Sequence, residues 1–598
     1  MKQNIVITGE GILCAIGQDK QGVLRSLRAQ RSGIGVMKHL QSVHHELPVG
    51  EVPLSNEDMR RLLGLANAPF VNRTTLMGML AVRQALADAH IDKAHVKKHA
   101  LRLVLISGTT VAGMDITERL FCRLEESAEA RQCLKYHSAG SCTRMIADYF
   151  DLFADYTTVS TACSSAANAL MLGARMLVDG EADIAVCGGS EALSRFHLNG
   201  FRSLMILDHE RCRPFDDTRG GLNLGEGAAF VVMETEEGSR KRGVEPHAYL
   251  TGYGNACDAF HQTASSANGE GAYRAMTEAL NMAGLKPADI QYVNAHGTGT
   301  ANNDQSESVA LKRVFGTQMP LVSSTKAFTG HTTSASGSIE AVICILALRH
   351  HFLPANLGWS QPMAEGIVPT LGKDECELHH VVCNAFGFGG NDTSLIFSVS
   401  RPTSRPTSRP TNSPTNSPNS PIHTLAEIEI TTEGQLAEIR DYVKPLEARR
   451  MGKLMKASLL ASLKALKQAG VSQPDAIITA TVHGCLEDSE QLLLQLTNEG
   501  ETTVSPTRFM QSTHNTIGSH IAIRLGCHGY NITYSQDDDS MRWAMHDAEQ
   551  LLRSGRCQTV LVGCHNETTP LFRRMMQHLG YGDVPTIYAK AIVMSCGR

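Results

Sequence analysis

Long apolar runs are absent from this chain of 598 residues. The longest, Ala341 to Leu348, has about eight residues, whereas a membrane-spanning helix needs about twenty. The first residues, MKQNIVITGEG, lead directly into a strand pattern and lack the apolar core of a signal peptide. We therefore expect a cytoplasmic protein without a membrane span.

Paired cysteine spacing and an excess of basic charge are also missing. The 16 cysteines form no CxxC motif and no cluster with histidine at zinc-ligand spacing, so we expect reduced, mostly buried thiols and no metal. Lys and Arg number 55 against 60 Asp and Glu, which gives a formal net charge of −5. This balance gives no support to nucleic-acid binding.

A low-complexity segment divides the chain. Residues 401–421 read RPTSRPTSRPTNSPTNSPNSP, which has no apolar face and favours extended structure. We interpret this segment as a linker between a body, residues 1–400, and a tail, residues 422–598. Hydrophobic residues make up 42% of the chain, enough for globular cores.

Short apolar strands alternate with longer helical patterns in the body, which predicts an α/β fold with mostly parallel, buried sheets. The predicted strands span residues 5–9, 101–107, 156–160, 182–189, 228–235 and 393–400. The predicted helices span residues 74–89, 164–180, 272–284 and 336–350.

The tail repeats part of the body. Residues 530–567 align with residues 156–191, so that Ser540 falls on Ser165 and Asp538 falls on Cys163. Nothing in the tail corresponds to residues 240–400. The run of acids at 537–539 could suggest a metal site, but consecutive side chains point in different directions, which disfavours one.

Cys163 is the first candidate catalytic residue. It lies in VSTACSSAANAL, where a strand runs into a helix through a turn of small residues. The positive end of the helix dipole at this position favours a thiolate. For an isolated cysteine, a buried structural role is the simpler interpretation.

Two histidines and a lysine follow predicted strand ends. His296 lies in NAHGTGT, and Lys326 and His331 lie in TKAFTGHT. Polar loops at strand ends can converge on a cleft. Two neutral imidazoles there could each donate one N–H to a developing enolate, and Lys326 could hold their tautomers, with Glu307 as its counter-charge.

The last glycine-rich loop, NAFGFGGN at 384–391, permits positive φ angles and close approach to a substrate. It matches neither GxGxxG nor GxxxxGK[ST], so we do not interpret it as a nucleotide loop.

Taken together, these motifs resemble β-ketoacyl-acyl-carrier-protein synthases of the elongating, decarboxylating type. Four motifs occur in order within residues 1–400. The resemblance implies the duplicated, five-layer αβαβα thiolase-like fold, with halves at 1–240 and 241–400, usually built as a homodimer or as a heterodimer with a ketosynthase-like subunit. The Cys-His-His set distinguishes it from thiolases, which carry a second Cys in the last loop.

The resemblance also implies roles for individual residues. Cys163 would carry the acyl group, His296 and His331 would promote decarboxylation of a malonyl thioester, Lys326 would support them, and Glu307 would lie behind them. The backbone N–H groups of Cys163 and Phe388 would form the oxyanion hole.

The same resemblance places substrates and partners. Thr298 and Thr300 would line the pantetheine tunnel, and Phe388 would gate the acyl pocket. No cofactor is expected, because phosphopantetheine arrives on the acyl carrier protein with the malonyl or acyl substrate. Arg60, Arg61 and Arg202 are candidate contacts for that acidic partner, although ordinary surface charge explains each equally well.

The tail is similar to truncated, half-thiolase-like ketosynthase domains that act as chain-length-factor-like partners in aryl polyene and type II polyketide systems. Since it lacks a cysteine at 538 and the half that supplies both histidines, we expect it to be non-catalytic. It would pack against the body or take the partner position. Three functions remain open: specialised polyketide condensation, housekeeping fatty-acid elongation, and a non-enzymatic chain-length scaffold.

Overall fold

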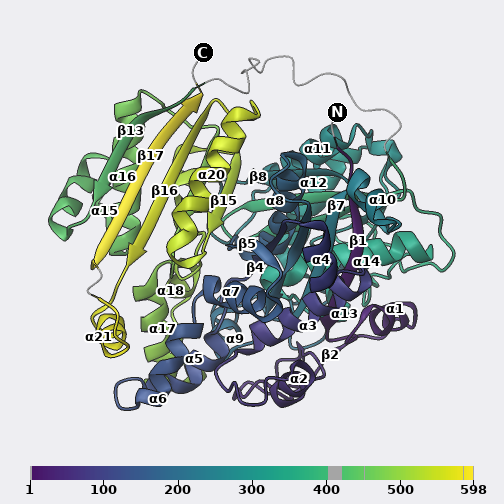
Figure 1. The fold of residues 1–598 in the computed structure, drawn as a ribbon, viewed down its shortest axis with the longest axis horizontal. Helices are drawn as coiled ribbons and strands as arrows, with labels where there is room; N and C mark the ends of the chain where they lie inside the picture. Colours follow the sequence, from purple (N-terminus) through teal and green to yellow (C-terminus); the bar gives the residue numbers. More distant parts are fainter. Residues whose placement is uncertain (1–2, 402–420, 450, 583–584, 597–598) are drawn as a thin grey trace.

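The computed structural model describes residues 3–401, 421–449, 451–582 and 585–596 (Figure 1). The predicted linker, 401–421, lies almost entirely outside the described residues. In the part of the chain that is described, no helix is long and apolar enough to cross a bilayer.

Three sets of five strands share one strand order. In the first half of the body the order is β1 (Ile5–Cys14), β7 (Gly227–Thr235), β6 (Ile184–Glu191), β4 (Leu103–Gly108), β5 (Phe153–Val159). In the second half it is β8 (Ala248–Cys257), β12 (Asn391–Ser398), β11 (His380–Gly387), β9 (Tyr292–Asn294), β10 (Leu321–Ser323). In the tail it is β13 (Ile422–Ile430), β17 (Ile587–Cys596), β16 (Thr559–Glu567), β14 (Ala476–Ala480), β15 (Tyr530–Tyr534).

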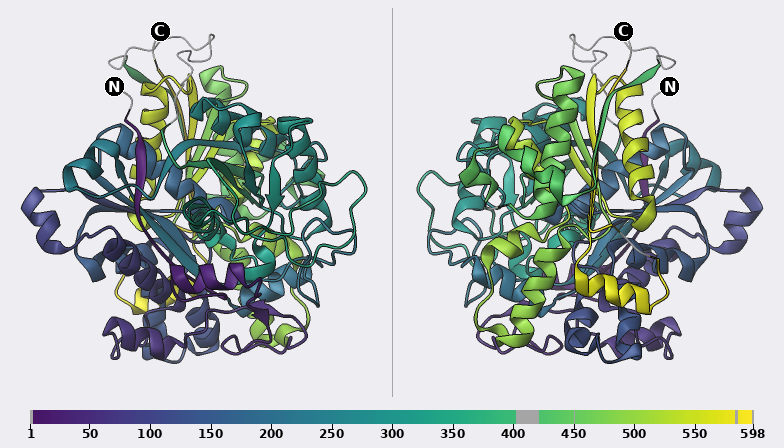
Figure 2. Two further views of the ribbon diagram at one scale, coloured as in Figure 1. Left: turned by 90° about the vertical axis from the view of Figure 1, so that its right-hand side faces the viewer. Right: turned by 90° about the vertical axis from the view of Figure 1, so that its left-hand side faces the viewer.

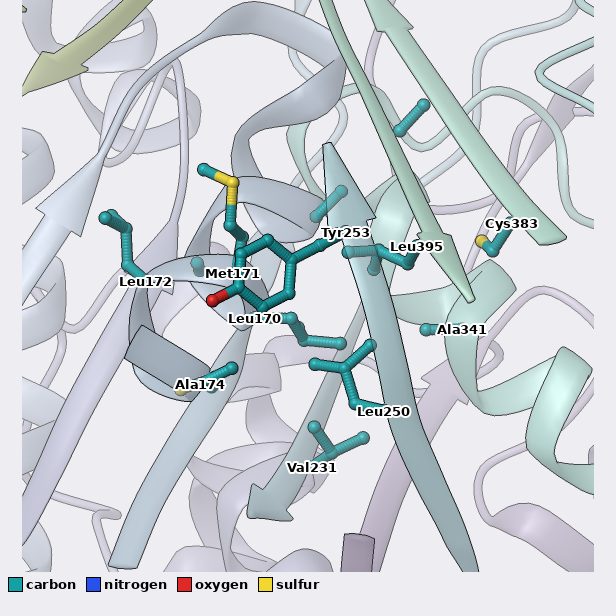
Figure 3. Packing of buried hydrophobic residues seen from close by; sticks show 14 of the residues in the cluster. Leu170, Met171, Leu172, Ala174, Val231, Leu250, Tyr253, Ala341, Cys383 and Leu395 are labelled. Carbon is teal, nitrogen blue, oxygen red and sulfur yellow. The ribbon is translucent and has the colours of Figure 1, made fainter. Parts of the chain in front are cut away.

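Helices sandwich these strands into layers. Helices α8 (Ser165–Val178) and α14 (Ser336–His350) are apolar on nearly all sides and lie between the two body sheets. Helix α3 (Arg73–Asp88) covers the outer face of the first sheet and α11 (Glu270–Ala283) that of the second. Figure 3 shows the centre, where Leu170 and Met171 of α8 lie among residues of β7, β8, β12 and α14. The predicted five-layer α/β fold is confirmed.

The expectation of mostly parallel sheets is wrong. In each set of five strands, two pairings are parallel and two are antiparallel. In the first half of the body, β4 pairs in parallel with β5 and β6, whereas β7 pairs antiparallel with β6 and β1. The glycine-rich loop 388–390 explains one case. It joins β11 to β12 across three residues, and so short a connection permits only antiparallel pairing.

The tail joins the body through the edge strands β5 and β15 (Figures 1 and 2). Val159 lies opposite Tyr534. The Ser160 N–H donates to the Thr533 carbonyl at 2.9 Å, and the Ser535 N–H donates to the Thr158 carbonyl at 3.0 Å. These residues are related by a constant offset of 375 positions, so equivalent positions of the two repeats bind each other. Such reciprocity is the mark of a two-fold, isologous interface.

Helix α20 (Ser540–Arg553) is the tail's counterpart of α8, and its surroundings differ. Helix α8 is enclosed by two sheets, whereas α20 covers one sheet. Its remaining surface is polar: Arg553 is exposed, and Arg542 pairs with Asp155 of the body at 2.9 Å. The polar outer face explains how the tail forms a half of the fold without the second sheet.

A buried ion pair crosses the interface between these helices. Arg175 of α8 lies 2.7 Å from Asp547 of α20, and both side chains are less than one-tenth exposed. The Tyr530 hydroxyl accepts from Arg175 at 3.0 Å and donates to Asp547 at 2.7 Å. Because both charges are removed from water, loss of either partner leaves an uncompensated buried charge.

We therefore expect Asp547→Leu to lower the free energy of unfolding by about 3–5 kcal/mol, and the double variant Arg175→Met/Asp547→Leu to recover most of that loss. Urea unfolding followed by the fluorescence of Trp543, which lies in the same helix, measures both. Glu549→Leu, which removes a solvent-exposed pair with Arg553, is the control and should change stability by less than about 1 kcal/mol. Equal stability of the single and double variants would contradict the expectation.

Candidate active site

The turn after β5 presents Cys163. Ala162 adopts a φ of 51°, a left-handed conformation, and Cys163 follows in a single turn of 3-10 helix before α8 begins. The Ser165 hydroxyl accepts from the Thr161 N–H at 2.9 Å and closes the turn. The small residues predicted to keep this turn tight therefore produce a sharp elbow with the thiol at its tip.

His331 reaches Cys163 from a second elbow of the same kind. Thr333, with a φ of 46°, begins the turn that leads into α14. The Nε2 atom of His331 lies 3.0 Å from the Sγ atom of Cys163, and its Nδ1 lies 3.0 Å from the Ser336 hydroxyl. Two turns that begin with a positive-φ residue, one in each half of the body, thus bring nucleophile and imidazole into contact.

His296 follows β9 and is fixed from both sides. Its backbone N–H donates to the Glu307 carboxylate at 2.9 Å, and the next N–H, of Gly297, donates to the same group at 2.7 Å. Its Nδ1 accepts from the Lys326 ammonium at 3.3 Å. Since an ammonium can only donate, the ring proton of neutral His296 lies on Nε2, the atom available to a substrate.

The expected pairing of Lys326 with Glu307 is wrong. Lys326 Nζ lies 2.6 Å from the Glu340 carboxylate of α14, and both side chains are almost completely buried. The two carboxylate oxygens of Glu307 instead accept hydrogen bonds from the backbone N–H groups of His296 and Gly297. Glu340 was missed because it lies inside an apolar helix pattern; its only signal was a lone acid beside the longest apolar run.

Burial sets the charge states of the site. It lowers the pKa of His296 and of His331 well below the ordinary value, and the nearby Lys326 charge lowers both further. Both rings are therefore neutral at pH 7, as expected. Burial also raises the pKa of Cys163 to about 11, while Lys326 and the backbone N–H groups of Phe388 and Cys163 act in the opposite direction. Burial therefore favours the neutral thiol at rest, and thiol deprotonation depends on the adjacent His331.

Cys163, His296 and His331 present ligand atoms within 4.8 Å of one another, a spacing that a metal ion could accept. However, the Lys326 ammonium contacts one of these rings, and a fixed positive charge there opposes binding of a cation. Of the acids at 537–539, Asp537 accepts from the Ser138 hydroxyl at 2.6 Å and pairs with Arg144 at 3.2 Å, so it serves the interface.

Phe388 lies beside the nucleophile and contacts the tail. Its backbone N–H lowers the pKa of the Cys163 thiol, and its ring stacks on Phe201 at 5.6 Å between centroids. Its carbonyl accepts from the Asn515 side chain of the tail at 2.9 Å. In addition, Ser160, which follows β5, hydrogen-bonds His514 of the tail at 2.9 Å. Tail residues therefore hold both loops that meet at Cys163.

A pocket opens from Cys163 between the body and the tail. The body supplies Cys163, Phe388 and aromatic residues of helix α9 (Arg195–Ser203) to its wall. The tail contributes residues from three segments to the same wall. These tail residues are His483, Ser489, Phe509, Ser512, Thr513 and His514.

Other predicted contacts lie away from this pocket wall. The hydroxyls of Thr298 and Thr300 hydrogen-bond each other at 2.9 Å beyond His296. Arg60 donates to carbonyls of residues 68, 69 and 71, Arg61 is exposed beside Asp58, and Arg202 donates to the Thr502 carbonyl. Arg60 is thus engaged in local structure, and Arg202 in a contact between the body and the tail.

Comparison with known proteins agrees with the geometry. Residues 2–238 match the model of the β-ketoacyl synthase N-terminal domain, and residues 247–360 match that of the C-terminal domain. Residues 426–598 match a second model of the N-terminal domain alone. 3-Oxoacyl-[acyl-carrier-protein] synthase 2 of Vibrio cholerae is 30% identical over 413 residues, which cover 66% of this chain and 99% of that protein. The chain belongs to the β-ketoacyl synthase family.

Two solved structures of ketosynthases with chain length factors are also similar to this chain. The ketosynthase ApeO in complex with its chain length factor ApeC from Xenorhabdus doucetiae is 30% identical, covers 67% of this chain and 98% of that chain, and has a TM-score of 0.57. The PfaC ketosynthase–chain length factor is 16% identical, and at this identity the similarity shows the fold alone. It covers 99% of this chain and 78% of that chain, with a TM-score of 0.77.

We expect Glu340→Gln to reduce malonyl-thioester decarboxylation at least about tenfold, because a neutral amide leaves Lys326 without its counter-charge and loosens its hold on His296. Decarboxylation is measured as acetyl-carrier formation from malonyl-carrier protein. Glu307→Gln is the matched comparison, since an amide oxygen can still accept one backbone N–H, and its loss should be smaller. A larger loss in Glu307→Gln would show that the pairing is misassigned.

Proposed function

We propose that this chain condenses an acyl thioester with malonyl-acyl-carrier protein to give 3-oxoacyl-carrier protein and carbon dioxide. The observation that carries this proposal is the 3.0 Å contact of Cys163 Sγ with His331 Nε2, beside a His296 whose Nε2–H is free to donate. The family comparisons support the same condensing acyltransferase chemistry.

In the first half-reaction the Cys163 sulfur attacks the acyl thioester carbonyl. Its proton passes by way of His331 to the departing phosphopantetheine thiolate of the carrier protein, and the acyl group remains on Cys163. In this proposal the N–H groups of Cys163 and Phe388 stabilise the oxyanion; that both lower the pKa of the Cys163 thiol supports such a role. Phosphopantetheine thus enters as part of the carrier-bound substrate, and the proposal requires no resident cofactor.

In the second half-reaction the malonyl thioester loses carbon dioxide, and the electron pair of the broken carbon–carbon bond forms an enolate. Neutral imidazole N–H groups of His296 and His331 stabilise its oxygen without a competing formal charge in the ring. The enolate carbon attacks the acyl-Cys163 carbonyl, and the sulfur leaves as a thiolate, which takes up one proton from solvent. Atoms and charges balance without an oxidant or reductant.

The tail, in this proposal, takes within one chain the position that a partner subunit takes in a two-fold ketosynthase pair. The reciprocal β5–β15 hydrogen bonds and the shared pocket support this. It is non-catalytic, because Asp538 occupies the position of Cys163 and no segment of the tail corresponds to the His296 and His331 loops. The fused partner favours specialised polyketide-type condensation, aryl polyene assembly included, over housekeeping elongation. A purely structural body is disfavoured because its catalytic set is intact.

Substitutions separate the two half-reactions. Cys163→Ala should leave no acyl-enzyme detectable by mass spectrometry, while decarboxylation of malonyl-carrier protein continues. His296→Ala and His331→Ala should each reduce decarboxylation by about 10²-fold or more, because one enolate donor is lost. Full condensation activity in Cys163→Ala would overturn the proposal.

The tail's grip on the Phe388 loop gives an independent test. Asn515→Ala removes a hydrogen bond to the Phe388 carbonyl and should lower kcat for self-acylation of Cys163 about three- to tenfold, with KM little changed. Malonyl decarboxylation, which relies on the two histidines, should fall less. Asn498→Ala, at an exposed position at the end of helix α17 (Leu486–Asn498), serves as the control. If both half-reactions fall equally in Asn515→Ala, the residue has only a general structural role.

A further inference from the structure

The pocket that leads from Cys163 has an unusual wall for a hydrocarbon chain. Four imidazole rings line it, two from the body, His137 and His197, and two from the tail, His483 and His514. None of these residues belongs to the catalytic set described above. Aromatic residues fill much of the remaining wall, including Phe201 and Phe509.

All four rings are neutral at physiological pH. Burial lowers the pKa of His137 to about 3 and the pKa values of His483 and His514 to about 4, and it also lowers the pKa of His197. A neutral imidazole offers one N–H donor and one nitrogen acceptor. The pocket therefore contains fixed hydrogen-bonding groups without fixed charge.

In two of the rings, those of His137 and His514, one nitrogen has a hydrogen-bond partner in the protein. His137 contacts the Thr117 hydroxyl at 2.8 Å, and His514 contacts that of Ser160 at 2.9 Å. The ring nitrogens of His197 and His483, by contrast, have no hydrogen-bond partner among the described residues of the chain.

The neighbours of these two rings are themselves rings. His197 packs edge-on against Phe201 and Phe509, and His483 lies 6.3 Å from His137 and 4.9 Å from Phe572 between centroids. These ring contacts hold His197 and His483 in the pocket wall without using their nitrogens. Body and tail thus each supply one oriented, unpaired imidazole to the same cavity.

We propose that this pocket selects acyl groups that carry a hydroxyl or keto oxygen along the chain, and that His197 and His483 supply hydrogen bonds to such oxygens. This inference rests on the proposed condensing function and specifies its acyl substrate. A saturated chain filling the pocket would exclude water from the two rings and replace none of their hydrogen bonds, which is costly. An oxygen-bearing chain restores them, and a pocket built this way discriminates against the analogue that lacks the oxygen.

Self-acylation of the full-length protein with pantetheine thioesters tests this directly. Three isosteric pairs are compared: 6-hydroxyhexanoyl with heptanoyl, 8-hydroxyoctanoyl with nonanoyl, and 10-hydroxydecanoyl with undecanoyl. In each pair a hydroxyl replaces a terminal methyl group, and the rate of acyl-Cys163 formation gives kcat/KM by mass spectrometry. We expect the hydroxylated member to be favoured by about fivefold or more in at least one pair.

His483→Phe and His197→Phe keep a ring of similar size and remove its nitrogens. Each should therefore lower the ratio of kcat/KM for the hydroxylated thioester to that for its hydrocarbon partner to one or below. His578→Phe, at an exposed position of helix α21 (Pro570–His578), should leave it unchanged. A preference for the hydrocarbon in all three pairs, or a preference for the hydroxyl that survives both Phe variants, would overturn the inference. A failure of every thioester to acylate Cys163 would instead overturn the proposed condensing function.

Discussion

The pairing of β5 with β15 is the constraint on which the rest of the structure depends. Strand β5 is the edge of the first body sheet, and the chain that leaves it reaches Cys163 four residues later. An unpaired edge there would expose backbone groups directly before the nucleophile. Through β15, the edge strand of its own sheet, the tail pairs with the C-terminal end of β5 and positions His514 and Asn515 beside the two loops that meet at the sulfur.

One local device, a residue with positive φ that begins a 3-10 turn leading into a helix, is used three times with three outcomes. At Ala162 it presents the nucleophile, and at Thr333 it follows the His331 that contacts it. At Asp537, with a φ of 45°, the same elbow survives in the tail, but its side chain now binds Ser138 and Arg144 of the body. The tail therefore preserves the backbone geometry of the nucleophile turn, and in the tail this turn binds the body.

Sequence patterns predicted much of this because the chemistry lies in short segments. The α/β layers, the family and the body-to-tail repeat could be recognised from periodicity and motifs such as TACSSA. What could not be predicted depends on distant packing. Glu340 emerges as the counter-charge only when α14 lies beside Lys326, and the raised pKa of Cys163 reflects burial that the helix-dipole argument ignored. Strand direction was likewise misjudged, since an apolar run has the same appearance in parallel and antiparallel sheets.

A partner module at this interface needs only half of the fold. The residues that reach the body's active site come from the segment 483–516 and from the β15 elbow, all within the first half of the repeat. A second half of the fold in the tail would supply another histidine pair and another sheet. Without a cysteine at 538 those histidines would have no nucleophile to serve. The loss of this second half exposes one face of α20, and that face carries charged residues where α8 carries apolar ones. Helix α20 therefore exposes little apolar surface although no second sheet covers it. The tail still provides the β15 edge and the pocket wall, the two features that the body requires.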